Sequence, residues 1–360
     1  MIRLFILLLA AFAVLVQVLH TGNALKNLVY QSELDRELAE PEQVVTLRST
    51  VRNIGRVPIF YVSLVESLPE TLRAEEDPAW CRRHVKSFFP GRCCTGQLYL
   101  LPHRRYTRQL HFSLPDRGSY PFGKYYMAAG DFLGFRTKHL DGQMEKRVVV
   151  MPRRWDDPRL AMTLGGYLGE ISVRRFLYED PVLTIGTREY TGAEPMKQIS
   201  WKQTARTGTL QVKNYDYTVD ANVTVLLNLD GGSPADRECC FQIARTVCET
   251  LEKRHIPYEF CGNGDLRGSH GELNWLAEGL GSQHFRTLMY ALGQSRGFVL
   301  FPFSKLVDRC LQKRRRSRGY IVISPPLRRQ EQEALRALRL LSETEPCLLI
   351  GAAEKGGDAP

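Results

Sequence analysis

The sequence predicts a mixed fold of an N-terminal membrane helix, an immunoglobulin-like β-sandwich and a Rossmann-like α/β domain. The first 20 residues are almost entirely apolar, short β-rich segments between turn formers follow, and strands alternate with helical patterns after residue 221. The expected parts are a membrane anchor at 1–22, the sandwich at 28–150, a linker at 151–220, the α/β domain at 221–352 and a flexible tail at 353–360.

Composition narrows the class of protein. The 360 residues carry a net charge of +10, and 43% are hydrophobic, which excludes wholesale disorder. Nine cysteines are too few for a disulfide scaffold, and their odd number leaves one unpaired, so a reducing compartment fits best. We find neither a repeat nor an intact catalytic signature.

The anchor prediction depends on the run from Leu4 to Leu19, whose single polar residue is Gln17. With its flanking residues this run reaches the thickness of the bilayer core, about 30 Å. We therefore expect a single-pass plasma-membrane protein whose body lies in the cytoplasm, although the flanking charges leave the orientation open. The alternative is a cleaved signal peptide, because Gly22-Asn23-Ala24 offers small residues for cleavage.

Alternating residues predict the sandwich. Leu110, Phe112 and Leu114 alternate with polar residues, which indicates one buried and one exposed face. Cys93 and Cys94 lie near a further cysteine and a histidine, but adjacent cysteines lack the two-residue gap typical of a zinc site. Structural thiols are the better interpretation.

The linker contains a glycine-containing segment at residues 165–170. It lacks the Lys-Ser/Thr ending of a phosphate-binding loop, and no strand comes directly before it. We therefore predict a flexible connection there.

The α/β prediction starts from the apolar strand Asn222–Leu229, which ends in Asp230. A helix with apolar residues every three or four positions follows, and further strands are expected at 258–261, 320–323 and 347–350. Alternating strands and helices predict a parallel sheet.

The most distinctive stretch is an Arg-Glu-Tyr segment followed by an Ile-x-Trp-Lys-x-Thr-Ala-Arg-x-Gly run. Its signature residues are Arg188, Glu189, Tyr190, Trp201, Lys202 and Arg206. This stretch resembles the signature of the bacterial domain-of-unknown-function family 58 (DUF58), and segments 53–56, 117–120 and 130–135 resemble landmarks of that family's sandwich. The resemblance implies a von Willebrand factor A-like C-terminal domain. Glu194 and Lys197 depart from the family's Pro-Gly-Asp and following Arg, which weakens any role for that loop.

Two roles for the signature remain open. We expect a structural lock between the domains, with the indole of Trp201 buried at the junction. The alternative is an exposed surface that a partner or an acidic ligand recognises.

The implied A-type domain permits a test for metal binding. Its metal site needs Asp-x-Ser-x-Ser, because Mg²⁺ prefers oxygen ligands. The corresponding residues here are Asp230, Gly232 and Pro234, so Asp230 and Ser233 form at most a degenerate site. We expect neither a metal nor a cofactor.

A basic patch lies near the C-terminus. It comprises Lys313, Arg314, Arg315, Arg316 and Arg318. No aromatic residue interrupts it to stack on bases, so a membrane surface or an acidic protein is favoured over a specific nucleic acid.

The leading hypothesis is a membrane-anchored, non-enzymatic interaction or scaffold protein of the bacterial membrane, without a small-molecule substrate. The resemblance implies action beside a MoxR-type AAA+ ATPase in assembly or envelope maintenance. One alternative is a thiol enzyme that uses Cys239 or Cys240 with His255 or His270. Another is a secreted or surface metal-dependent adhesin of A-domain type.

Overall fold

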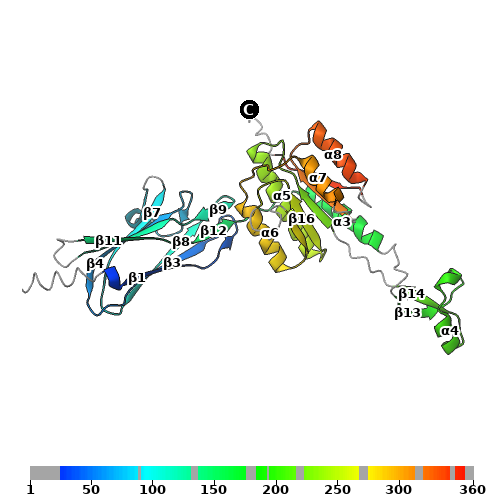
Figure 1. The fold of residues 1–360 in the computed structure, drawn as a ribbon, viewed down its shortest axis with the longest axis horizontal. Helices are drawn as coiled ribbons and strands as arrows, with labels where there is room; N and C mark the ends of the chain where they lie inside the picture. Colours follow the sequence, from blue (N-terminus) through cyan, green and yellow to red (C-terminus); the bar gives the residue numbers. More distant parts are fainter. Residues whose placement is uncertain are drawn as a thin grey trace, which may run out of the picture. The chain divides into compact units, whose positions relative to one another are not determined.

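The computed structural model describes residues 25–87, 91–130, 137–175, 184–192, 194–215, 223–266, 275–312, 319–340 and 345–352. The chain divides into two compact units, whose elements are labelled in Figure 1. Unit 1 contains residues 1–153 and 292–294, and unit 2 contains residues 154–291 and 295–360.

Unit 1 is built from strands in three sheets. The first contains β1 (Leu28–Leu34), β3 (Val45–Asn53), β8 (Arg105–Ser113) and β5 (Arg73–Ala74), in that order. The second contains β11 (Thr137–Gln143), β10 (Lys124–Gly130), β4 (Ile59–Leu68), β7 (Arg92–Leu100) and β6 (Val85–Ser87). The third contains β2 (Leu38–Ala39), β12 (Arg147–Val150) and β9 (Gly118–Pro121). A short turn, η1 (Leu25–Asn27), leads into β1, and α2 (Pro78–His84) leads into β6.

The core of unit 1 follows from alternation along these strands. In β3, buried residues such as Leu47 and Val51 alternate with exposed or half-buried ones. Val51 of the first sheet and Leu64 of the second belong to one buried cluster. The two larger sheets therefore share a core, as in a sandwich.

A buried ion pair connects these two sheets. Arg108 on β8 binds Glu66 on β4, and their side chains are 7% and 1% exposed. The Tyr30 hydroxyl on β1 donates to the same carboxylate at 2.6 Å. Burial lowers the pKa of Arg108, but the charges of Glu66 and Cys94 and the hydrogen bond to Glu66 together outweigh it and raise that pKa, so Arg108 stays charged. Gly96 makes room, because a Cβ there would lie 2.9 Å from Arg108 Nη1.

Unit 2 contains a five-stranded sheet. Its order is β17 (Trp275–Gly279), β16 (Tyr258–Gly262), β15 (Val223–Leu227), β18 (Gly319–Ser324) and β19 (Cys347–Ile350). The last four strands are parallel to one another, whereas β17 pairs antiparallel with β16. Strands β15, β16 and β18 are buried throughout, as parallel strands covered on both faces are.

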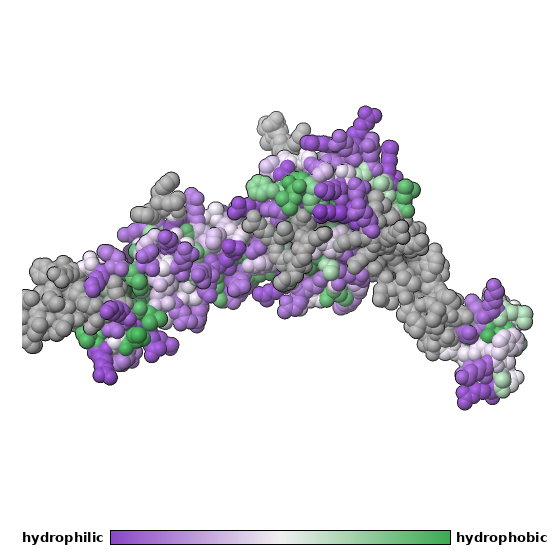
Figure 2. Space-filling view, viewed as in Figure 1, coloured by the Kyte–Doolittle hydropathy of each residue, from purple (hydrophilic) through white to green (hydrophobic). Residues whose placement is uncertain are grey.

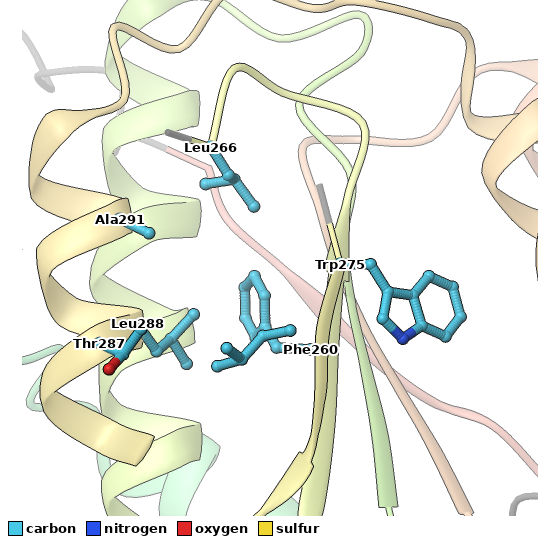
Figure 3. A pocket seen from close by; sticks show the side chains of 7 residues that line it. Phe260, Leu266, Trp275, Thr287, Leu288 and Ala291 are labelled. Atoms are coloured by element: carbon cyan, nitrogen blue, oxygen red, sulfur yellow. The ribbon is translucent and has the colours of Figure 1, made fainter. Parts of the chain in front are cut away.

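Helices cover both faces of this sheet. One face carries α7 (Phe303–Gln312) and α8 (Arg329–Arg339), whose apolar residues share a cluster with Leu226 and Val322. The other face carries α5 (Pro234–Lys253) and α6 (Ser282–Gln294), and Figure 3 shows Phe260 and Leu288 between the sheet and these helices.

The segment predicted to be a flexible linker is partly helical. Residues 165–170 lie within α3 (Pro158–Arg175). Leu160, Leu164, Leu168 and Ile171 are buried at helical spacing, and the hydroxyl of Tyr167 donates to the carbonyl of Tyr320 at 3.0 Å. The prediction of a flexible connection was wrong because burial of this apolar face stabilises the helix despite its three glycines.

The predicted fold class is also wrong for the chain as a whole. Strands account for 39% of the described residues and helices for 31%, because two antiparallel sheets, a mixed three-stranded sheet and a strand pair in the presumed linker add to the α/β sheet. The predicted anchor, residues 1–22, lies outside the described residues. In the part that the structure describes, every helix is too short or too polar to cross a membrane. The predicted transmembrane helix and single-pass plasma-membrane localisation are corrected to this finding, that the described residues contain no membrane-spanning helix.

We predict that Glu66→Gln destabilises the protein by about 3–5 kcal/mol, because it leaves the buried Arg108 without its counter-ion. Chemical denaturation of the full chain measures this change. The double variant Glu66→Leu/Arg108→Met removes both charges and should lose less stability than Glu66→Gln. A larger loss in the double variant would show that the pair itself stabilises the sandwich.

Candidate functional site

The carboxyl edge of the parallel strands is the usual ligand-binding position in an open α/β sheet. Three buried polar residues meet there: Asn228 after β15, Asn263 after β16 and Ser324 at the end of β18. Asn228 Nδ2 donates to Ser324 Oγ at 2.9 Å, and Asn263 Nδ2 donates to Asn228 Oδ1 at 2.7 Å.

The same amides also bind the backbone of the following loop. The N–H of Leu229 donates to Asn263 Oδ1 at 2.8 Å, and the N–H of Asp230 donates to Asn228 Oδ1 at 2.9 Å. These polar groups therefore hold the strand ends and the loop together rather than facing an open site.

Ser233, one of the two residues of the degenerate metal site, has a structural role. Ser233 is the N-cap of α5, where it forms a capping box with Asp236. Among the residues described, no three His, Cys, Asp or Glu side chains lie close enough to hold a metal ion.

Gly231 and Gly232, in the loop after β15, pack closely against Arg328 and Pro325. Gly231 adopts a φ of 78°, which favours glycine, and its carbonyl accepts from Arg328 Nη2 at 3.1 Å. A Cβ at Gly232 would lie 2.6 Å from Pro325. The edge is thus filled by protein.

The thiols proposed for an enzyme are buried. Cys239 and Cys240 lie on α5, and burial raises the pKa of Cys240 to about 12. His255 is exposed, whereas His270 lies outside the described residues. A thiol with such a raised pKa carries almost no thiolate at neutral pH, which is the reactive form.

The adjacent cysteines of unit 1, Cys93 and Cys94, are buried as well. Burial raises the pKa of Cys94 to about 12, and Cys93 is buried beside it on β7. His84 contacts the carbonyl of Thr95 through Nδ1 at 3.0 Å. These residues are structural thiols and a backbone-bound histidine.

A pocket beside α6 is too small for a ligand. Figure 3 shows Phe260, Leu266 and Leu288 around it. The cavity measures about 10 Å³, which is about the minimum space for one water molecule.

The signature residues form a small module, which we call the signature module (residues 184–192 and 194–215). It contains β13 (Thr184–Glu189), η2 (Met196–Gln198), α4 (Trp201–Thr207) and β14 (Gln211–Tyr215). The two strands pair antiparallel, and α4 contacts β14 (Figure 1). Gly208 ends α4 with a φ of 75°, the left-handed conformation that glycine adopts readily.

Hydrogen bonds hold α4 on the strand pair. The N–H of Ser200 donates to the carbonyl of Gln211 at 2.7 Å, and the N–H of Gln211 donates to Thr204 Oγ1 at 3.0 Å. The described residues of the module bury Ile199, Ser200, Gln211 and Val212. The module thus has a very small core.

The signature tryptophan is exposed. Trp201 retains 60% of its accessible surface, and Met196 and Leu210 retain 70% and 44%. The prediction of a buried Trp201 is therefore wrong, because α4 presents the indole to solvent. Lys202 and Arg206 are exposed on the same short helix.

The Arg-Glu-Tyr segment contacts the loop that contains Glu194, the loop that departs from the family pattern. Arg188 Nη1 binds Glu194 Oε1 at 2.5 Å, and the Thr191 hydroxyl donates to the same oxygen at 2.7 Å. The Thr191 hydrogen bond and then Arg188 lower the pKa of Glu194 to about 2. Glu194 therefore shapes this loop, although it departs from the family pattern. Glu189 is exposed, and the N–H of Tyr190 donates to the carbonyl of Leu210 at 2.9 Å.

The predicted basic patch, Lys313, Arg314, Arg315, Arg316 and Arg318, lies outside the described residues. Its proposed role stays a prediction.

Comparison with known proteins finds no relative by sequence, because no family model and no curated protein matches the chain. Structural matches are distant. The CARDB domain of the PF1109 protein from Pyrococcus furiosus, solved with di-metal ions, is 9% identical, with 34% of this chain and 91% of that chain covered and a TM-score of 0.21. The GAE domain of GGA2p from Saccharomyces cerevisiae is 10% identical, with 32% and 88% covered and a TM-score of 0.22. A fragment of Escherichia coli alpha-2-macroglobulin is 13% identical, with 35% and 17% covered and a TM-score of 0.24.

Scores this low carry no argument about function. The comparisons do not support the resemblance to domain-of-unknown-function family 58 or the MoxR-associated role, and both stay predictions. The assignment of a von Willebrand factor A-type domain is corrected, because the described chain is richer in strand than in helix.

We predict that Asn228→Leu destabilises unit 2, because it removes the acceptor for the amide of Asn263 and the N–H of Asp230. Each buried donor left unsatisfied should cost about 1–3 kcal/mol. Thermal and chemical unfolding measure the loss. Gln283→Leu, at an exposed position of α6, is the control and should change stability by less than about 0.5 kcal/mol. Equal effects would show that the amide network contributes nothing.

We also predict that Thr191→Val raises the pKa of Glu194 from about 2 toward the usual range for Glu, about 4.3. Because the folded pKa is lowered, the carboxylate stabilises the module above the unfolded pKa and loses this effect as the pH falls toward 2. A carboxyl-detected NMR titration measures the pKa, with Thr187→Val as the control. An unchanged Glu194 titration in Thr191→Val would contradict this assignment.

Proposed function

We propose that this chain is a non-enzymatic interaction protein that binds a partner protein through the signature module. The observation that carries this proposal is the exposure of Trp201, at 60%, on a module that its own fold does not bury. Large apolar side chains on a surface mark contact sites when they gather with complementary charge. Tryptophan and arginine are the residues most enriched among the energetic centres of protein interfaces.

The surroundings of Trp201 specify the kind of partner. Met196 and Leu210 add exposed apolar area, and Figure 2 shows hydrophobic surface beside hydrophilic surface on this module. Lys197, Lys202 and Arg206 are exposed. The module has five basic residues against Glu189 and Glu194, so it favours a partner with an apolar pocket rimmed by carboxylates.

Other features support binding rather than catalysis. At the carboxyl edge of the parallel sheet, Asn228, Asn263 and Ser324 bond to one another, and the cysteines of α5 are buried. A catalytic site needs an accessible group poised to react, and these groups are engaged in the fold. The signature module, in contrast, offers the accessible side chains of Trp201, Lys202 and Arg206.

The test joins partner identification with a quantitative variant. A photo-crosslinking amino acid at Lys202 in the full chain, expressed in its native cells, identifies the bound protein. Binding of the purified partner to the full chain is then measured by calorimetry. Trp201→Ala should weaken it at least roughly 30-fold, the equivalent of a loss of about 2 kcal/mol.

Stability provides the second arm of the test. Because Trp201 is exposed, Trp201→Ala should change the free energy of unfolding by less than about 0.5 kcal/mol. The control is Tyr126→Ala, which removes an aromatic side chain that is 50% exposed on β10 and should leave partner binding unchanged. Unfolding of Trp201→Ala at a much lower temperature, with partner binding intact, would restore the structural-lock interpretation.

A further inference from the structure

An open groove crosses the outer face of the first sheet of unit 1. It encloses about 730 Å³, within the size range of binding sites. We call it the arginine groove, and it is lined by Val29, Gln31, Thr50, Arg52, Ile54, His103, Arg104 and Arg105. No acidic residue is among these lining residues.

The strand register places like charges side by side in this groove. Arg52 on β3 lies directly opposite Arg105 on β8, and Val29 on β1 lies opposite Arg52 on the other side. Side chains of directly opposed residues on neighbouring strands are close enough to interact, and like charges there are destabilising. The sheet thus tolerates a repulsion that an anion between the two guanidinium groups would remove.

The protein supplies no such anion from its described residues. Arg52, Arg104 and Arg105 form no ion pair within the part of the chain that the structure describes. Glu33, on the same face of β1, accepts from Gln31 Nε2 at 3.0 Å. By comparison, the buried Arg108 on the other face of β8 has its own carboxylate partner.

The loop at the rim adds another polar group. His103 has a φ of 56° in a turn closed by a hydrogen bond from Arg104 N–H to the carbonyl of Leu101. Positive φ favours glycine at such a position, yet the chain places an imidazole there. His103 and Arg104 lie directly before Arg105, the first residue of β8, and line the groove with it.

We propose that the arginine groove binds an acidic peptide segment of a protein partner, at a site separate from the signature module. Guanidinium groups bind carboxylates through paired hydrogen bonds. Val29 and Ile54 are each 46% exposed in the groove and supply apolar contacts for neighbouring side chains of that peptide. Hydrophobic and hydrophilic patches adjoin one another on the face of unit 1 seen in Figure 2.

A peptide fits this groove better than a nucleic acid does. None of the lining residues is a Phe, Tyr or Trp that could stack on a base, which is the usual source of affinity for single strands. The mixture of cations with aliphatic side chains instead matches a segment in which carboxylates alternate with apolar residues. This inference does not depend on the function proposed for Trp201.

The experiment uses the full chain and a fluorescein-labelled peptide of four Asp-Leu repeats, followed by fluorescence anisotropy. The peptide should bind, and its affinity should fall with increasing salt. The double variant Arg52→Gln/Arg105→Gln should weaken binding at least about tenfold. Its melting temperature should stay the same or rise, because the repulsion between the two arginines is removed.

Two controls separate this site from general attraction. Arg82→Gln/Arg83→Gln removes the same charge from exposed positions on α2 and should leave peptide binding unchanged. A peptide of Asn-Leu repeats should not bind. Equal loss in both double variants, no binding of the acidic peptide, or tighter binding of a single-stranded oligonucleotide would each overturn the proposal.

Discussion

The sandwich of unit 1 depends on one buried ion pair between its sheets. Glu66 and Arg108 lie on strands of different sheets, and Tyr30 brings a third strand to the same carboxylate. A charge this deep is tolerated only with its partner in place, so the two sheets must adopt one relative register. That register also fixes the outer face of β8, because the residues from Arg108 to Phe112 alternate between buried positions and exposed or half-buried ones.

Alternation and helical spacing were the parts of the fold that the sequence could predict. The strand expected at 222–229 is β15, and the helix after it is α5, because buried parallel strands and amphipathic helices have distinctive patterns. The helix α3 was missed because its glycines concealed the spacing from Leu160 to Ile171. The antiparallel edge strand β17 has little burial and no clear pattern.

The candidate site was less predictable than the fold. The signature around Trp201 was visible as a motif, but a motif does not show whether its indole is covered. The amides of Asn228 and Asn263 carry no sequence pattern, and only the parallel sheet brings strand ends 35 residues apart together. Likewise, Arg52 and Arg105 become neighbours through strand pairing alone, so no local pattern could have indicated the groove.

The small core of the signature module has a kinetic consequence. With Ile199 and Val212 as its buried apolar residues among those described, local hydrogen bonds provide most of what holds α4 on the strand pair. Such a segment opens at a low free-energy cost, and its amide protons exchange with solvent faster than those of β15 or β18. A partner bound over the indole, as proposed, would also have to keep the module closed, and this ordering would consume part of the binding free energy.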